Sequence, residues 1–256
     1  MRCESQGKGC ISMEVTILGC CGGYPGPGQA ASGYLLTIGD KKVLLDCGSG
    51  VFSNLQLHVP INGLDAILLS HLHADHYSDL MVMRYAIDMN AKRGMEFKNV
   101  PIFAPKTPES VISSLSNDWG YKIGYIGHES ELPLFGAKAR FFRTQHPVEC
   151  YGIRIEYEGK VFVYTADCSV DTRFAGYLDD ADLCIIDCGE LEANRRPNML
   201  HLTPKECYSC AKALRVKKMI LSHMVPFYDR EDIELEARAC GDWNYELAQV
   251  NKTYRI

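Results

Sequence analysis

Residues 70–80 read SHLHADHYSDL, which places three histidines and two aspartates within nine positions directly after the apolar run LDAILL. His71 and His73 are two residues apart, so in an extended segment their imidazoles project to the same side and can share one metal ion. Asp75 and His76 follow where the chain is expected to turn into a helix, which presents them from another direction. The stretch therefore predicts a strand that ends in a site for two neighbouring metal ions.

Two ions need more ligands, and three later predicted strands end in suitable side chains. His146 follows ARFFRTQ, Asp167 follows KVFVYTA, and His223 follows KKMILS. Each of these alone is more often a hydrogen-bonded or solvent-facing residue than a ligand. Together with residues 71–76 they form a set of imidazoles and carboxylates without a thiolate, which favours two divalent ions, zinc first, with manganese or iron also allowed.

The surrounding pattern alternates short apolar runs with helical periodicity, which is typical of an α/β fold with two layers of strands and outer helices. Thr203, Pro204 and Glu206 combine an N-cap, a first-turn proline and a capping box, so a helix is expected to begin there. The predicted strands are 15–19, 34–38, 41–48, 65–70, 139–147, 151–159, 160–168, 182–189 and 217–223, and the predicted helices are 49–59, 78–94 and 203–214.

The composition narrows the class of protein. A hydrophobic content of 46% is ample for a packed core, and the net charge of -5 gives no global attraction to nucleic acid. The apolar runs are shorter than the ~20 residues that a bilayer requires, and the first ten residues lack the apolar core of a signal peptide. We therefore expect a cytoplasmic protein. Residues 1–12 are expected to be an extension, or the product of an early start codon, and residues 13–256 one domain.

Twelve cysteines in such a chain indicate a reducing compartment, where they serve as small apolar residues or ligands. Cys207 and Cys210 form a single C-x-x-C inside the predicted helix, with no second pair to complete a structural zinc site. We interpret both as plain thiols.

The run HLHADH also matches the H-x-H-x-D-H signature of the metallo-β-lactamase fold hydrolases at every defined position, and the chain resembles that superfamily from about Met13 onward. The resemblance implies an αββα sandwich of two mixed sheets with outer helices. It implies a first metal held by His71, His73 and His146, a second held by Asp75, His76 and His223, and Asp167 as the bridge between them. The aspartate disfavours the common dinuclear β-lactamases, which place a cysteine there, and His73 disfavours flavodiiron proteins, which have a glutamate.

Two further residues gain roles from the resemblance. Asp46, in VLLDCG, corresponds to an early aspartate that orients ligand histidines, although it could equally be a strand-end turn residue. His201, in NMLHLTPKE, resembles a histidine of the ribonuclease Z and small phosphodiesterase branch, which faces the metals and stabilises or protonates the reacting phosphate. The alternative is that His201 only caps the helix or packs beneath the loop.

The loops offer weaker expectations. The Gly-rich segment from Gly19 to Gly33 is expected to border the site as a mobile rim, with an ordinary irregular connection as the alternative. Arg195 and Arg196 are candidates to anchor a phosphate near His201, although paired arginines on a loop are more often simply solvated.

The predicted activity is metal-dependent hydrolysis of a phosphodiester, in which a metal-bridging hydroxide attacks phosphorus, Asp75 takes or orients its proton, and His201 donates one. A thioester or lactone hydrolase of the glyoxalase II type uses the same seven ligands but lacks a counterpart of His201. A metal-binding protein without catalysis is the third alternative. The expected substrate is a small molecule or a short phosphodiester; a homodimer is left open, and no membrane partner is expected. Transfer RNA is not expected, because the twenty residues between His146 and Asp167 leave no room for the arm that grips it in full ribonuclease Z.

Overall fold

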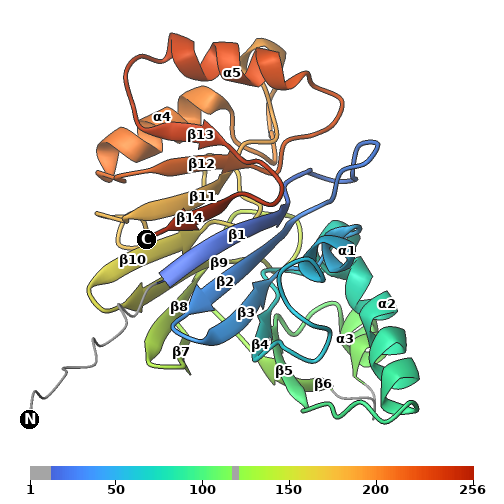
Figure 1. Cartoon of the computed structure of the whole chain (residues 1–256). Coiled ribbons are helices and arrows are strands. Elements are labelled where there is room, and N and C mark those ends of the chain that lie inside the picture. Colours follow the sequence, from blue (N-terminus) through green and yellow to red (C-terminus); the bar gives the residue numbers. More distant parts are fainter. Residues whose placement is uncertain (1–12, 117–120) are drawn as a thin grey trace, which may run out of the picture.

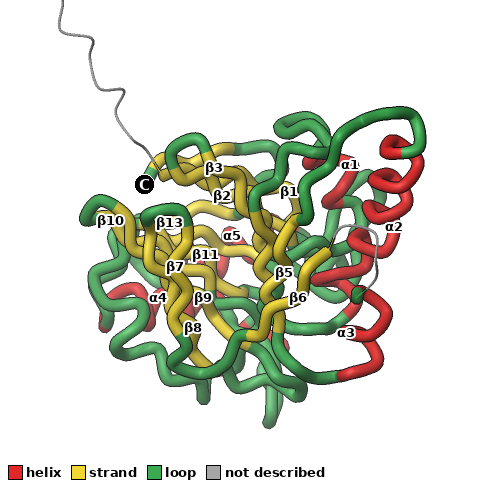
Figure 2. Tube along the Cα trace, turned by 90° about the horizontal axis from the view of Figure 1, so that it is seen from below, coloured by secondary structure: helices red, strands yellow, loops and turns green. Residues whose placement is uncertain are grey.

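A computed structural model describes residues 13–116 and 121–256, so the predicted extension over residues 1–12 lies outside the described part of the chain. Two seven-stranded sheets lie face to face, with α1, α2 and α3 beside the first and α4 and α5 beside the second (Figure 1). Figure 2 shows the strands gathered between the helical layers. The predicted α/β sandwich of two mixed sheets with outer helices is confirmed. None of the described helices is long and apolar enough to cross a bilayer.

The first sheet is antiparallel at one edge and parallel from β3 to β6. Its order is β14 (Thr253–Arg255), β1 (Met13–Gly19), β2 (Gly33–Ile38), β3 (Lys41–Leu45), β4 (Ala66–Leu68), β5 (Val100–Ala104) and β6 (Tyr121–Tyr125). Alternate residues of these strands enter different layers: Leu35 and Leu44 pack with the helices, whereas Leu36 and Val43 join the core shared with the second sheet. Both faces are therefore covered, which explains the near-continuous apolar character of the strands.

The second sheet mirrors this arrangement, with β10 to β13 parallel and β7 to β10 antiparallel. Its order is β13 (Tyr245–Leu247), β12 (Met219–Ser222), β11 (Leu183–Asp187), β10 (Lys160–Tyr164), β9 (Tyr151–Tyr157), β8 (Ala137–Arg143) and β7 (Glu131–Leu134). Strands β9 and β10 form a plain hairpin between His146 and Asp167, as the short spacing predicts.

The helices are α1 (Val51–Leu55), α2 (Ala74–Ala91), α3 (Glu109–Leu115), α4 (Pro204–Ala213) and α5 (Arg230–Ala239), with a 3₁₀ turn η1 at Glu192–Asn194. The capping box at Thr203 is confirmed, since its side chain accepts from the Glu206 amide while Glu206 reaches back to Thr203. The prediction of a helix over 49–59 is wrong in length. The observed helix α1 ends at Leu55. Pro60 lacks the amide hydrogen that would bond the carbonyl of Gln56, so the helix cannot be extended toward the C-terminus.

The fold brings the ends of strands from both sheets to one edge of the sandwich. The chain leaves β3 at Asp46, β4 just before His71, β10 just before Asp167, and β12 at His223. These are the carboxyl ends of strands in the parallel portions of the sheets, where open α/β folds ordinarily bind ligands.

Candidate metal centre

The first cluster of side chains matches the first predicted ligand set. The Nδ1 atom of His73 lies 3.2 Å from Nε2 of His71 and 3.0 Å from Nε2 of His146. The Asp167 Oδ2 atom lies 3.6 Å from Nε2 of His71 and 3.7 Å from Nε2 of His146. Four potential ligand atoms therefore surround one small volume, all within 4.8 Å of one another.

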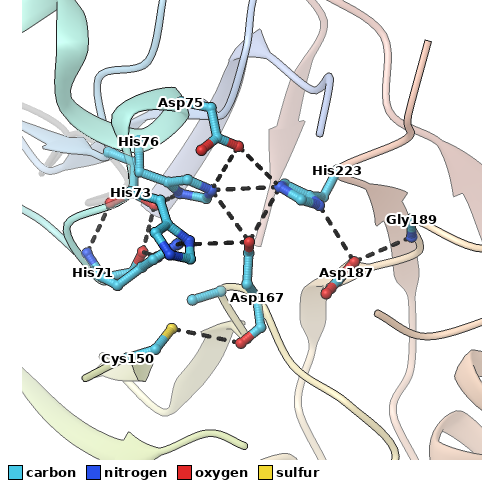
Figure 3. A network of polar contacts seen from close by, with 12 residues as sticks. His71, His73, Asp75, His76, Cys150, Asp167, Asp187, Gly189 and His223 are labelled. Atoms are coloured by element: carbon cyan, nitrogen blue, oxygen red, sulfur yellow. Dashed lines mark hydrogen bonds and ion pairs between the residues drawn. The ribbon is translucent and has the colours of Figure 1, made fainter. Parts of the chain in front are cut away.

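The second cluster lies directly beside the first (Figure 3). The Oδ2 atom of Asp75 lies 3.4 Å from Nε2 of His76 and 3.3 Å from Nε2 of His223. The Asp167 Oδ1 atom completes this group at 3.2 Å and 3.3 Å from the same two nitrogens. Asp167 thus directs one oxygen into each cluster, which is the arrangement a bridging carboxylate requires.

These spacings fit metal ions. A tetrahedral ion with metal–ligand distances of about 2.0–2.2 Å separates its ligand atoms by roughly 3.3–3.6 Å. The buried Oδ1 of Asp167 accepts no hydrogen bond, although it faces two ring nitrogens. A buried carboxylate oxygen without a donor is costly unless a cation satisfies it. The residues present therefore suit two divalent ions, with nitrogen and oxygen donors in each cluster.

The electrostatics of the second cluster favour a positive charge. Burial opposes the protonation of His223, yet Asp167, Asp187 and Asp75 raise the pKa of its imidazole to about 10. Burial likewise raises the pKa of Asp75, but the imidazoles of His223 and His76 hold it below its usual range. A divalent ion placed among these carboxylates provides that positive charge directly.

The first cluster favours neutral imidazoles. Burial lowers the pKa of His71 well below its ordinary value, and it lowers the pKa of His146 to about 4, where neighbouring histidines add to the effect. A neutral imidazole offers a lone pair, which is the form that binds a metal.

The buried carboxylate of Asp46 orients His76 directly and His71 through Ser70. Asp46 Oδ2 accepts hydrogen bonds from His76 Nδ1, the Ser70 hydroxyl and the Tyr164 hydroxyl, each at 2.7 Å. His71 Nδ1 lies 3.0 Å from the Ser70 hydroxyl oxygen, to which it can donate. Both rings are thereby turned with Nε2 toward the clusters. Asp46 has the predicted position, whereas Ser70 and Tyr164 were not identified from the sequence.

A second buried carboxylate, Asp187, was also not identified. Its Oδ2 accepts from His201 Nδ1 at 2.8 Å and from the Cys168 amide at 2.9 Å, while Oδ1 accepts from the Gly189 amide at 3.1 Å. Oδ1 also lies 3.5 Å from His223 Nδ1 (Figure 3). The signal available in the sequence was the position of Asp187 at the end of the apolar strand LCIID, which parallels that of Asp46.

His201 lies beside the clusters without joining them. Its ring stacks on that of His223 with centroids 4.8 Å apart and lies 5.9 Å from that of His146. Burial would lower the pKa of His201, but the charge and hydrogen bond of Asp187 raise it. Asp187, His201 and His223 also meet the spacing of a metal cluster. We interpret them as a hydrogen-bonded group, because the 2.8 Å contact is a hydrogen-bond length and His223 already directs Nε2 elsewhere.

Backbone geometry is unusual where the strands deliver these side chains. Asp46, Ala166 and His223 have φ angles of 56°, 56° and 57°, in the left-handed region that non-glycine residues seldom adopt. Such conformations persist only when surrounding contacts hold them, and they concentrate at functional sites.

The Gly-rich loop borders the second cluster, as predicted. The Gly23 amide donates to Asp75 Oδ2 at 2.9 Å. A Cβ on Gly22 would lie 2.5 Å from the carbonyl oxygen of His223 and 2.6 Å from its Nδ1, so only glycine allows the loop to approach this closely.

The remaining candidates fall outside the clusters. Arg195 and Arg196 line a pocket with His201, but Arg195 pairs with Glu192 and Glu206, and Arg196 pairs with Glu190. Their charges are therefore already neutralised.

The two cysteines of the C-x-x-C join no metal-type cluster among the described residues. Cys207 is buried and donates to the carbonyl oxygen of Asp187, and Cys210 is half-buried.

Comparison with known proteins agrees with this geometry. Residues 41–224 match the family model described as "Beta-lactamase superfamily domain". The chain is 32% identical to "Probable metallo-hydrolase YhfI" of Bacillus subtilis, over 93% of this chain and 97% of that protein. The crystal structure of YhfI superimposes with a TM-score of 0.90 and covers 95% of this chain and 99% of that one.

Two further similarities are more distant. A protein of Mycobacterium bovis named "Ribonuclease Z" is 26% identical over 95% of this chain and 98% of its own length. A solved structure titled as a new diphosphatase from the PhnP family has a TM-score of 0.74 at 22% identity, with 94% of this chain and 97% of that chain covered, which shows the shared fold.

Proposed function

Because the chain belongs to the beta-lactamase superfamily and is a metallo-hydrolase of that fold, we propose that it is a phosphodiesterase with two divalent ions in its clusters. The observation that carries the proposal is His201, an imidazole that stands beside both clusters and is tied to Asp187 through Nδ1. A hydrolase of thioesters or lactones needs no such additional group. The similarity to a protein named ribonuclease Z supports the same substrate class.

The two ions would supply an acidified water between them and neutralise charge on the phosphoryl oxygens. The first would be held by His71, His73 and His146, the second by Asp75, His76 and His223, and both by Asp167. Zinc suits these donors best, and manganese or iron is compatible with them.

Three side chains of the protein, Asp75, His201 and Asp187, would perform the remaining roles. Asp75 is anchored by the Gly23 amide and its lowered pKa keeps it negatively charged, so its carboxylate can orient the attacking water. His201 is held through Nδ1, which leaves Nε2 to donate a proton to the phosphoryl oxygen or the leaving group. Asp187 fixes the direction of that ring.

A short or small phosphodiester suits this site better than transfer RNA. Strands β9 and β10 join the loops of His146 and Asp167 by a plain hairpin, and no protruding arm occurs between them. The net charge of -5 offers no general attraction to a polynucleotide.

The test is hydrolysis of bis(p-nitrophenyl) phosphate beside a thioester and a lactone, with bound metal quantified in every preparation. We expect diester turnover that falls by about 10²- to 10⁴-fold in His201→Ala at unchanged metal content, as for the loss of a general acid. His58→Ala is the matched control, because His58 is exposed and its ring contacts Asn251.

Thioester cleavage independent of His201, without diester turnover, would replace this proposal by a glyoxalase-like activity. Two bound metals without hydrolysis of any ester would point to a non-catalytic protein.

A further inference from the structure

A second pocket lies on the surface formed by β8 and by the loops that follow β8 and β10. It has a volume of about 500 Å³, within the range of small-molecule sites. Its lining includes Arg140, Arg143, Gln145, Asp171, Arg173 and Tyr177. No residue of this set was identified from the sequence, and none is a metal ligand.

The loops that line the pocket also carry two of the candidate metal ligands, His146 and Asp167. Gln145 directly precedes His146. The backbone amide of Gln145 donates to the Thr172 hydroxyl at 2.9 Å, and its backbone carbonyl accepts from the Ser169 backbone amide at 3.1 Å. The Thr144 hydroxyl donates to the Asp167 carbonyl at 2.8 Å. These bonds join the His146 loop to the Asp167 loop. Asp171 lines this pocket and also the pocket that contains His201, so the two pockets adjoin.

Part of the charge in the pocket is already balanced. Glu129 accepts from the Arg140 guanidinium and from the Tyr177 hydroxyl, and that guanidinium also lies over the Tyr177 ring. Glu129, Arg140 and Tyr177 therefore form a part of the pocket lining that carries no net charge.

Two arginines of the pocket form no close ion pair with a carboxylate among the described residues. Arg143 contacts the Val148 carbonyl, at 3.4 Å, and the face of the Tyr151 ring, with 5.6 Å to its centroid. Its charge also helps to lower the pKa of Glu149, against the effect of burial. Arg173 is exposed and forms no hydrogen bond or ion pair with another described residue. Asp171 is the one opposing carboxylate that lines the pocket outside the Glu129 group. Among the lining residues, two arginines without a close ion pair therefore face one such carboxylate. By contrast, Arg195 and Arg196, which line the adjoining pocket with Asp171, are both paired.

We propose that this pocket binds a second anionic group of the substrate, a phosphate or carboxylate separate from the scissile phosphodiester, through Arg143 and Arg173. The inference rests on the proposed phosphodiesterase function and narrows its substrate class to diesters that carry an additional negative charge. Guanidinium groups match such oxyanions through paired N–H donors, and Gln145 adds a neutral donor next to His146.

A pair of chromogenic diesters tests it. Thymidine 5′-(p-nitrophenyl phosphate) and its 3′-phosphorylated form release the same phenolate and differ only in the extra phosphate. We expect at least a tenfold lower KM for the phosphorylated form at low ionic strength, and a smaller preference as salt screens the exposed arginines. Each of Arg143→Gln and Arg173→Gln should remove about fivefold of that preference and leave turnover of the unphosphorylated diester unchanged. Arg238→Gln, an exposed arginine paired with Glu234 on α5, is the matched control.

Calorimetric binding of thymidine 3′,5′-bisphosphate against thymidine 5′-phosphate gives a readout independent of turnover. Hydrolysis of both diesters with no preference in the wild type, or with a preference that both variants retain, would overturn the second site and leave the phosphodiesterase intact. If neither diester is hydrolysed but the bisphosphate binds more tightly in an arginine-dependent manner, the anion site stands and the proposed activity falls. Absence of both effects would overturn both.

Discussion

The carboxylate of Asp187 provides a sharp test of how the site is built, because Asp187→Asn changes its charge at nearly constant shape. The carboxylate accepts from His201 Nδ1, from two backbone amides, and lies near His223 Nδ1. An asparagine must present its NH₂ group to one of these donors, so it cannot retain all of the contacts.

The cost can be estimated from the lost contact to His201. A hydrogen bond to a charged group contributes about 1.5–3 kcal/mol, which corresponds to a reduction of about 10- to 150-fold in kcat. The effect should act through the direction and protonation of the His201 ring. In a His201→Ala background the same substitution should therefore cost less than about threefold, as expected for residues that work as one unit.

The assay is diester hydrolysis by the wild type, both single variants and the double variant, each at measured metal content. Asp180→Asn serves as the control, because this aspartate is exposed and pairs with Arg215 on the surface. An equal cost of Asp187→Asn with and without His201 would refute the positioning role, and so would full activity of the single variant.

Three other perturbations have defined outcomes. Gly22→Ala should weaken metal retention by about tenfold or more, because its Cβ would clash with the backbone and ring of His223, and metal per chain after dialysis measures this; full retention would contradict the close approach. Chelation should lower the melting temperature by about 10 °C, since ions at roughly a thousand times their Kd contribute about 4 kcal/mol, and an unchanged melting curve would argue against metals in the folded protein. Glu246→Gln should destabilise the fold by about 1 kcal/mol at pH 7, because Lys218 and Lys252 outweigh burial and lower the Glu246 pKa to about 2. That difference should be complete above about pH 4.5 and disappear as the pH falls toward 2 in chemical denaturation, and a difference that persists at pH 2 would contradict it.

The candidate ligand set could be predicted from the sequence because its members follow apolar strands. That regularity placed residues 71–76 and three distant side chains at one sheet edge, and the structure brings them within a few ångströms of one another. Asp187 follows the same rule but was not identified, because a lone aspartate after a strand is also a common turn residue.

Other features depend on tertiary contacts that no local pattern encodes. The three-residue strands β13 and β14 are too short to show alternation, and they exist because β12 and β1 offer free edges. Arg143 and Arg173 are thirty residues apart in the sequence and line one pocket because the backbone of Gln145 bonds to Thr172 and Ser169. Conversely, Arg195 and Arg196 were candidates to bind a phosphate on the basis of the sequence, but in the structure each is paired with a carboxylate.

We propose that Asp167 joins two metal sites. Anomalous diffraction at the absorption edge of the bound metal tests this most directly. We expect two peaks about 3.5–4 Å apart, one on each side of the Asp167 carboxylate, as in other two-metal hydrolases. A single peak in the fully loaded protein, or a peak between Asp187 and His201, would contradict it.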